Sequence, residues 1–101
     1  RIRESGLDFD SVVTADDELA VGAVKYASRN GLRIPEDFQI TGYNNSVLAN
    51  CSTPEITTLD NQVEFMCTTA VSQMMQVFQK HRIPSRTMFS GYVVEQKTTR
   101  K

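Results

Sequence analysis

The chain has 101 residues, enough for one small domain with a modest hydrophobic core. Its composition is 40% hydrophobic and 23% charged, and the formal net charge is −1, so it lacks the basic excess that is typical of nucleic-acid binding. No apolar run approaches the length that a membrane span requires.

The first third of the chain is predicted to form a strand followed by a helix. Residues 1–8 have the features of a helix C-terminus, which suggests that the chain opens inside a larger structural unit. The β-branched run at residues 9–14 predicts a strand. Asp16 is the best N-cap for a helix that runs to about Asn30, and Gly31 is placed to end it. The predicted core stripe of this helix is Leu19, Ala20, Ala23, Val24 and Ala27.

Two more short strands are predicted in the middle of the chain. Residues 32–37 form a connector in which Pro35 enforces an extended turn. The alternating segment 38–43 predicts the second strand, and residues 56–59 predict the third. The chain between them is expected to be irregular, with one helical turn at residues 47–50.

A long amphipathic helix is predicted after the third strand. Asp60 or Asn61 is expected to cap it, and Asn61 with Glu64 resembles a capping box. Residues 81–86 break the helix, and a last strand is expected from about residue 87 to 96, followed by a polar, frayed tail. The apolar positions of the helix, which keep helical spacing throughout, are Val63, Met66, Cys67, Ala70, Met74, Val77 and Phe78.

The alternation of strands and helices over connectors of this length predicts an α/β fold with a parallel sheet. In open α/β sheets, ligands bind outside the carboxyl ends of the strands. Those ends carry residues 14–16 and 43–45, which are short polar groups able to bind hydroxyls or ring nitrogens. The pattern therefore supports a small-molecule site without naming the molecule.

Asn44 and Asn45 follow the second strand in the motif GYNNS, residues 42–46. Asparagine tolerates left-handed backbone angles and caps local amides, so turn chemistry explains both residues. Their place at a strand end also fits a ligand contact. The local sequence leaves both interpretations open.

Few residues suggest catalysis or metal binding. Asp16, Asp17 and Glu18 are explained more simply by a helix start, where the dipole favours acids, than by catalysis or a cation site. Because no other carboxylate or histidine cluster converges on them, we expect no metal and no cofactor. His81 is the single histidine, and neither a nucleophile motif nor a phosphate loop is present. The two cysteines fit no zinc or CxxC spacing and are interpreted as reduced thiols of a cytosolic protein. We therefore expect that the protein is not an enzyme.

A series of short motifs covers most of the chain. They are an Asp-Asp pair at 16–17, AVGA at 20–23, GLRIPED at 31–37, GYNN at 42–45, PEITTL at 54–59 and KTT at 97–99. In this order and spacing, the chain resembles the C-terminal half of LacI/GalR-family transcriptional regulators, the lactose-repressor and galactose-repressor family. The resemblance covers about residues 7–99.

This resemblance implies a two-lobed, periplasmic-binding-protein-like fold, of which the chain is a fragment covering mainly the C-terminal lobe. Residues 1–60 would belong to that lobe, residues 61–84 would be a helix crossing to the N-terminal lobe, and residues 85–101 would be the return strand and tail. The resemblance further implies a cytoplasmic homodimer that senses a small-molecule effector, a sugar or a related compound. Effector binding would control the binding of operator DNA by a helix-turn-helix domain that is absent from this chain.

The resemblance also assigns roles to individual residues. Asp16 matches a strand-end position that often bonds the effector, and Asn44 matches an Asp that commonly binds sugar hydroxyls or a base. An Asn at this position can donate as well as accept, so the effector preference is open. Cys67, at a helix glycine of the family, and Gln96, at an expected Arg, are further departures. The residues expected at the dimer interface are Val21, Lys25, Leu48 and Cys51.

Two alternatives to a regulator stay open at this point. A periplasmic or extracellular sugar-binding protein for transport would share the fold, would need a signal peptide upstream and would usually be monomeric. A phospho-accepting receiver domain or small α/β enzyme would use Asp16 and Asp17. It would also need another strand-end Asp and a late Lys near these acids, whereas Lys25 and Lys80 are both predicted on helices.

Overall fold

The computed structural model describes residues 8–101. Its elements, in chain order, are β1 (Ser11–Val13), α1 (Asp17–Arg29), β2 (Gln39–Thr41), α2 (Val47–Cys51), β3 (Thr58–Asp60), α3 (Val63–Phe78) and β4 (Tyr92–Val94). The predicted helix end at residues 1–8 lies outside the described residues, apart from Asp8.

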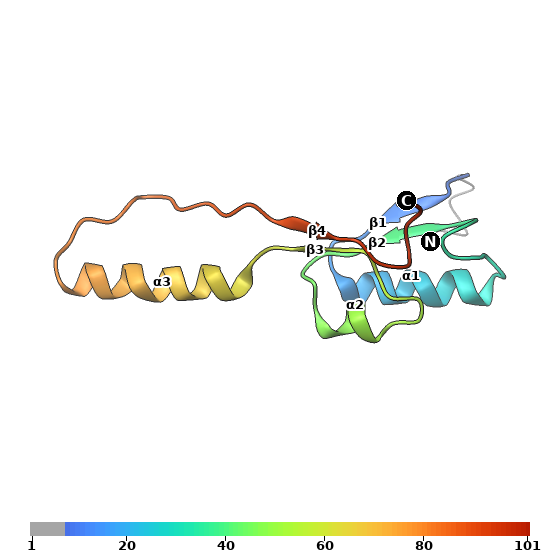
Figure 1. The fold of residues 1–101 in the computed structure, drawn as a ribbon, viewed down its shortest axis with the longest axis horizontal. Coiled ribbons are helices and arrows are strands. Elements are labelled where there is room, and N and C mark those ends of the chain that lie inside the picture. Colours follow the sequence, from blue (N-terminus) through green and yellow to red (C-terminus); the bar gives the residue numbers. More distant parts are fainter. Residues whose placement is uncertain (1–7) are drawn as a thin grey trace.

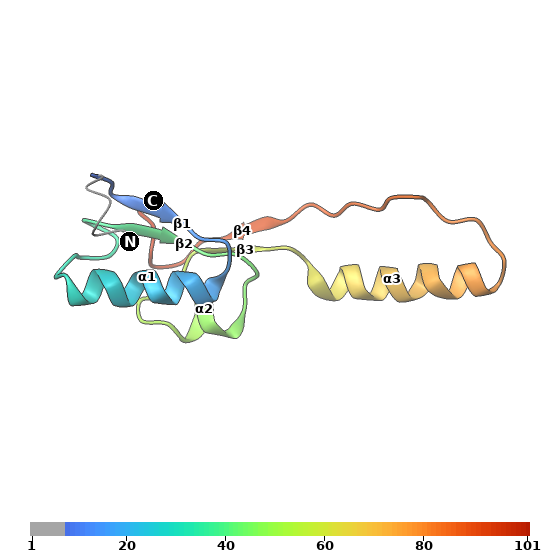
Figure 2. The ribbon, with the colours of Figure 1, turned by 180° about the vertical axis from the view of Figure 1, so that it is seen from behind.

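The chain consists of a body and an arm (Figure 1). The body contains β1, α1, β2, α2 and β3, and the arm consists of α3 and the segment 79–91, which returns beside it (Figure 2). The molecule is therefore elongated, with extents of 59 × 26 × 20 Å. Within the arm, the rings of Phe65 and Phe89 meet edge to face with centroids 5.2 Å apart. Gln73 Nε2 donates a hydrogen bond to Thr87 Oγ1 at 2.8 Å, which also ties the returning segment to α3.

The strands of the body run parallel. β1 pairs with β2 so that Val12 lies opposite Ile40. A parallel bridge between Thr41 and Thr57 extends the arrangement towards β3. These pairings confirm the predicted α/β class with parallel strands. β4 instead pairs antiparallel with β3, because the chain leaves the body along β3 and returns along β4 (Figure 1).

Local signals explain the start, the end and the buried face of α1. Asp16 Oδ1 accepts a hydrogen bond from the Leu19 backbone N–H at 2.7 Å, which confirms the predicted cap. Gly31 has a φ of 67°, the left-handed angle that favours glycine after a helix. Leu19 was expected in the core but is 57% exposed, because it lies outside the buried face of the helix. The core consists of Ala20, Ala23, Val24, Ala27, Phe38, Ile40, Ala49 and Ile56.

α3 does not begin as predicted. Its N-cap residue is Gln62, which has a left-handed φ of 58° and makes no side-chain cap. The predicted capping box between Asn61 and Glu64 is therefore wrong. The Asn61 side chain instead donates to Asn44 Oδ1 at 3.1 Å, and Asp60 Oδ1 accepts from the Gln62 N–H at 2.7 Å.

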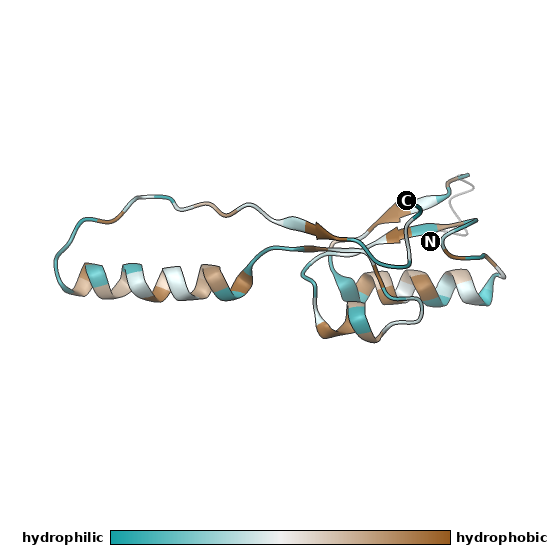
Figure 3. Ribbon diagram, viewed as in Figure 1, coloured by the Kyte–Doolittle hydropathy of each residue, from teal (hydrophilic) through white to brown (hydrophobic). Residues whose placement is uncertain are grey.

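The apolar stripe of α3 is not covered within the described chain. None of the helix residues is buried, and Val63, Met74 and Phe78 are 50%, 58% and 71% exposed. Figure 3 shows hydrophobic residues recurring along this helix. A long exposed apolar surface of this kind is typical of a contact with another protein element. Within residues 8–101, no helix has the length and apolarity that a membrane crossing needs.

The C-terminal segment differs from the prediction at both of its ends. The expected strand at residues 87–96 is reduced to β4, because Thr87 and Phe89 contact α3 rather than another strand. The tail is not frayed. Thr98 is fully buried. Its Oγ1 donates a hydrogen bond to the Ile40 carbonyl at 2.6 Å and accepts one from the Thr57 N–H at 2.9 Å. These bonds secure the tail to β2 and to the segment before β3.

Candidate ligand-binding site

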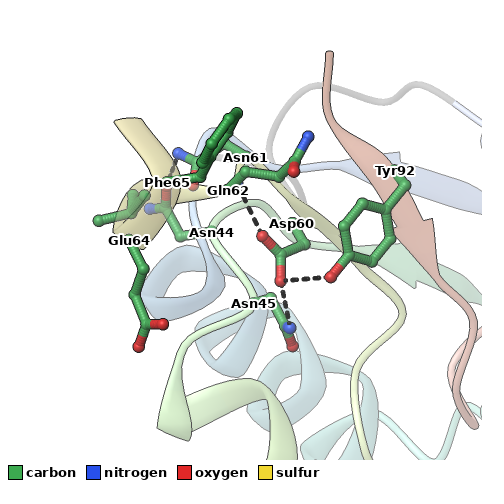
Figure 4. A pocket seen from close by; sticks show the side chains of 9 residues that line it. Asn44, Asn45, Asp60, Asn61, Gln62, Glu64, Phe65 and Tyr92 are labelled. Atoms are coloured by element: carbon green, nitrogen blue, oxygen red, sulfur yellow. Dashed lines mark hydrogen bonds between the residues drawn. The ribbon is translucent and has the colours of Figure 1, made fainter. Parts of the chain in front are cut away.

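A cavity of about 490 Å³ lies where the arm leaves the body (Figure 4). Three segments form its wall: the turn after β2, the chain from the end of β3 through the first turn of α3, and the first residue of β4. The lining residues are Asn44, Asn45, Asp60, Asn61, Gln62, Val63, Glu64, Phe65 and Tyr92. The cavity is thus bounded on one side by the carboxyl end of β2, where ligands bind in open α/β sheets.

Asn44 and Asn45 both adopt left-handed backbone angles, with φ values of 103° and 48°. Asn45 is used internally, because its Nδ2 donates to Asp60 Oδ2 at 2.9 Å and its N–H donates to Thr58 Oγ1 at 3.2 Å. Asn44 is exposed, and its Oδ1 accepts from Asn61 Nδ2 at 3.1 Å. Asn44 and Asn45 therefore form a turn, as the turn interpretation predicts. The side chain of Asn44 also lines the cavity, beside that of Asn61 from the β3–α3 connection.

The Asp60 carboxylate organises the cavity wall. Its Oδ2 accepts hydrogen bonds from Asn45 Nδ2 at 2.9 Å and from the Tyr92 hydroxyl at 3.1 Å, and its Oδ1 accepts from the Gln62 N–H at 2.7 Å. These hydrogen bonds hold the pKa of Asp60 below its ordinary value of 3.8, and the bond from Asn45 has the largest effect. The bond to this carboxylate raises the pKa of Tyr92 above 10.0. Asp60 is therefore an ionised acceptor at neutral pH.

The chemistry of the lining residues suits a polar, uncharged ligand. An asparagine amide can donate to and accept from hydroxyl groups. Asn44 is the exposed member of the pair, whereas Asn61 Oδ1 is buried without a hydrogen-bond partner. Phe65 and Tyr92 supply aromatic surface for the apolar face of a ring. Two carboxylates and no Lys, Arg or His occur among the nine lining residues, which disfavours an anionic ligand. The lining residues include no Ser, Thr or Cys, so they do not resemble a nucleophile with its base.

The two adjacent acids before α1 have different environments. Asp16 uses Oδ1 to cap α1 and is not one of the residues that line the cavity. Asp17 is 1% exposed, and it accepts from the Thr58 hydroxyl at 2.6 Å and from the Ser46 N–H at 2.7 Å. Asp17 thus fixes the turn that carries Asn44. The sequence did not distinguish this role, since both acids equally fit a helix N-terminus.

The periplasmic binding protein-like domain model matches residues 5–99. The chain belongs to this family. An HTH-type transcriptional regulator of Lachnoclostridium phytofermentans is 43% identical over 95% of this chain and 29% of its own length. The lactose operon repressor of Escherichia coli is 26% identical over 93% of this chain and 26% of its own length. A solved LacI-type transcription regulator from Bifidobacterium animalis subsp. lactis has 25% identity and a TM-score of 0.89, covering 99% of this chain and 36% of that one.

These similarities confirm the predicted resemblance to LacI/GalR-family regulators and the periplasmic-binding-protein-like fold. The chain spans less than a third of the length of the two curated regulators. It fits the effector-binding part of such proteins, and these relatives are regulators rather than enzymes.

The residues predicted at a dimer interface lie on α1 and α2, which pack against each other in the body (Figure 1). Lys25 and Cys51 are exposed, and Leu48 is 43% exposed. Val21 is half-buried and packs against the edge of the core. Each of the four side chains therefore keeps some surface that the described residues do not cover.

The two departures from the LacI/GalR pattern have different surroundings. Cys67 is exposed on α3. Gln96 is engaged in the body, because its Nε2 donates to the Ile56 carbonyl at 2.9 Å and to Asn50 Oδ1 at 3.3 Å. Its N–H also donates to Thr57 Oγ1 at 2.9 Å. Gln96 therefore ties the chain after β4 to the connection between α2 and β3.

Sequence reasoning identified Asn44 but missed most of the cavity wall. It interpreted Asn61 and Glu64 as a helix cap, Phe65 was given no role, and Tyr92 was only part of a strand. Asn61 could have been identified, because it follows the end of a strand as Asn44 does, and ligands bind beyond such strand ends. Tyr92 could not be found in this way, because only the antiparallel return of β4 brings it beside Asp60.

Proposed function

We propose that this chain is the effector-sensing part of a LacI/GalR-type regulator in which ligand binding controls operator binding by a helix-turn-helix domain outside the chain. The observation that carries the proposal is the Asn44–Asn61 amide pair at a cavity beside the connections between body and arm. A ligand held there touches both the body and the start of the arm. If these parts move relative to one another, the ligand binds one arrangement better and shifts the population towards it.

The proposed division into lobes agrees with the elongated shape. Residues 1–60 form the C-terminal lobe, residues 61–84 cross to the N-terminal lobe, and residues 85–101 return. The exposed apolar stripe of α3 supports this division, since a second lobe encoded upstream would cover it. The buried Thr98 supports the return of the tail to the C-terminal lobe.

The proposed effector is a sugar or a related uncharged small molecule. Asn44 and Asn61 would bind its hydroxyls, and Phe65 and Tyr92 would pack on its ring. Asp16 does not line the cavity, so we propose it as a second contact for an effector that extends past the lining residues, through the Oδ2 atom that does not cap α1. The carboxylates of the cavity wall support an uncharged molecule over a sugar phosphate.

The proposed assembly is a cytoplasmic homodimer. Val21, Lys25, Leu48 and Cys51 would form its surface on α1 and α2. The name of the Escherichia coli relative, an operon repressor, supports operator DNA as the partner of the whole protein. The modest negative charge of this chain supports a DNA-binding role for another part of that protein.

A sugar-binding protein for transport is the second candidate, because the matching family model is named for periplasmic binding proteins. The names of the two curated relatives favour a regulator. A monomer in sedimentation experiments that retains no operator DNA would instead favour transport.

A thermal-shift titration of the full-length parent protein tests the ligand site. The panel contains D-glucose, D-galactose, glucose 6-phosphate, adenine and adenosine. A ligand that binds only the folded protein raises its melting temperature. We expect a neutral sugar or a nucleoside to do so, glucose 6-phosphate to have no effect, and the shift to disappear in Asn44→Ala.

Gln76→Ala is the matched control, because Gln76 is an exposed amide on α3 that does not line the cavity. The control should keep the full shift. A shift that survives in Asn44→Ala would place the ligand elsewhere, and a shift produced only by glucose 6-phosphate would contradict the charge argument.

A further inference from the structure

One carboxylate joins three segments of the chain at the place where the arm leaves the body. Asp60 ends β3, and its direct partner in the antiparallel pair is Tyr92, the first residue of β4. Asp60 Oδ2 accepts from the Tyr92 hydroxyl at 3.1 Å and from Asn45 Nδ2 at 2.9 Å, while Oδ1 accepts from the Gln62 N–H at 2.7 Å. Asn45 belongs to the turn at the cavity, Gln62 to the outgoing connection and Tyr92 to the returning one (Figure 4).

Gln62 makes a second tie between the two connections. Its side-chain amide donates to the Ser90 carbonyl of the returning segment. Its left-handed backbone, with a φ of 58°, is uncommon for a residue with a side chain and persists only where neighbouring contacts hold it. The Asp60 carboxylate provides such a contact and satisfies an N–H at the start of α3 that has no partner within the helix.

We propose that Asp60 is the positioning residue of this junction: it locks the cavity turn to both connections between body and arm, so that the three segments move as one unit. The inference rests on the proposed function only in treating the turn at Asn44 as the effector contact. A ligand that shifts this turn would then move both connections through a single side chain. The turn and the connections are far apart in sequence, so a shared acceptor is a direct route between them.

Hydrogen–deuterium exchange of the full-length parent protein, without any ligand, tests the lock. Tyr92→Phe keeps the ring and removes only the hydroxyl that bonds Asp60. We expect amides at residues 44–46 and 62–65 to exchange about two- to tenfold faster, although neither peptide contains the substitution. Asp60→Ala should accelerate these peptides and residues 90–93 together.

Tyr26→Phe is the matched control, because the Tyr26 hydroxyl lies on α1, away from the cavity, and should leave all three segments unchanged. If Tyr92→Phe alters only peptides that contain residue 92, or Asp60→Ala leaves residues 44–46 unchanged, the lock does not exist. A sugar panel without any thermal shift would overturn the proposed effector and leave this exchange result standing. Failure of the lock would in turn leave the ligand site untouched, so the two results are separable.

Discussion

The Asp17 carboxylate accepts a hydrogen bond from the Thr58 hydroxyl at 2.6 Å inside the body, where Asp17 is 1% exposed. This contact joins the first turn of α1 to the first residue of β3, far along the chain. The second carboxylate oxygen accepts from the Ser46 N–H at 2.7 Å. Gly42 lies against the same carboxylate so closely that a Cβ would collide with it. The carboxylate therefore contacts both ends of the GYNNS motif, at Gly42 and Ser46, and fixes the position of the turn that carries Asn44.

Asp17→Ala should lower the free energy of unfolding by about 1–3 kcal/mol, because the Thr58 hydroxyl and the Ser46 N–H would lose their acceptor in a buried place. Urea unfolding of the full-length parent protein measures the change. Glu18→Ala is the matched control, since its exposed neighbouring carboxylate should change stability by no more than about 0.5 kcal/mol. Equal effects of the two substitutions would mean that Asp17 acts only as another acid at a helix start.

Thr98→Val should also destabilise the protein by about 1–3 kcal/mol, although the two side chains have nearly the same shape. The buried Thr98 hydroxyl bonds both the Ile40 carbonyl and the Thr57 N–H, and valine would leave both without a partner. Thr53→Val, at an exposed position, is the control and should be close to neutral. Urea midpoints that coincide for the two variants would show that the tail is only loosely attached.

Most of the body could be predicted because its signals are local. The Asp16 cap, the left-handed Gly31 and the apolar spacing of α1 each depend on residues within one or two helical turns of each other. Strand-end polarity then selected Asn44, since the carboxyl ends of parallel strands share one edge of the sheet.

The features that could not be predicted depend on contacts between distant segments. Asn61 is not the N-cap of α3, and its side chain instead donates a hydrogen bond to Asn44. The tail is ordered because Thr98 bonds to Ile40. Tyr92 enters the cavity wall only through the pairing of β4 with β3. A polar tail and an ordinary helix start have the same local sequence whether or not such partners exist, so no local pattern distinguishes them.

The Arg33–Asp37 pair predicts a specific acid titration. Arg33 Nε and Nη2 each donate to the Asp37 carboxylate at 2.8 Å, and these hydrogen bonds lower the pKa of Asp37 from 3.8 to about 2. Because the pKa is lower in the folded state, the stabilisation is fully present above pH 3.8 and is lost as the pH falls towards 2. The pair is exposed, so its effect on stability is small and screened by salt.

Carboxyl-carbon NMR of the parent protein should find the Asp37 midpoint near 2. In Arg33→Gln the midpoint should move up towards 3.8, while Arg29→Gln, a change of another exposed arginine, should leave it in place. An Asp37 midpoint near 3.8 in the unaltered protein would show that the pair does not persist in solution.

Leu48→Arg should raise the dissociation constant of the proposed homodimer of the full-length parent about tenfold or more. The reason is that a charge would replace an apolar side chain at a contact that the proposed dimer buries. Sedimentation velocity over a range of concentrations measures the dissociation. Leu19→Arg is the matched control: Leu19 is an exposed leucine, and at 100° per residue it lies on the opposite flank of α1 from Val21. Both variants should keep the melting temperature of the monomer fold. If Leu48→Arg sediments like the unaltered protein while Leu19→Arg dissociates, the subunits meet on the other flank of α1 and the proposed surface is wrong.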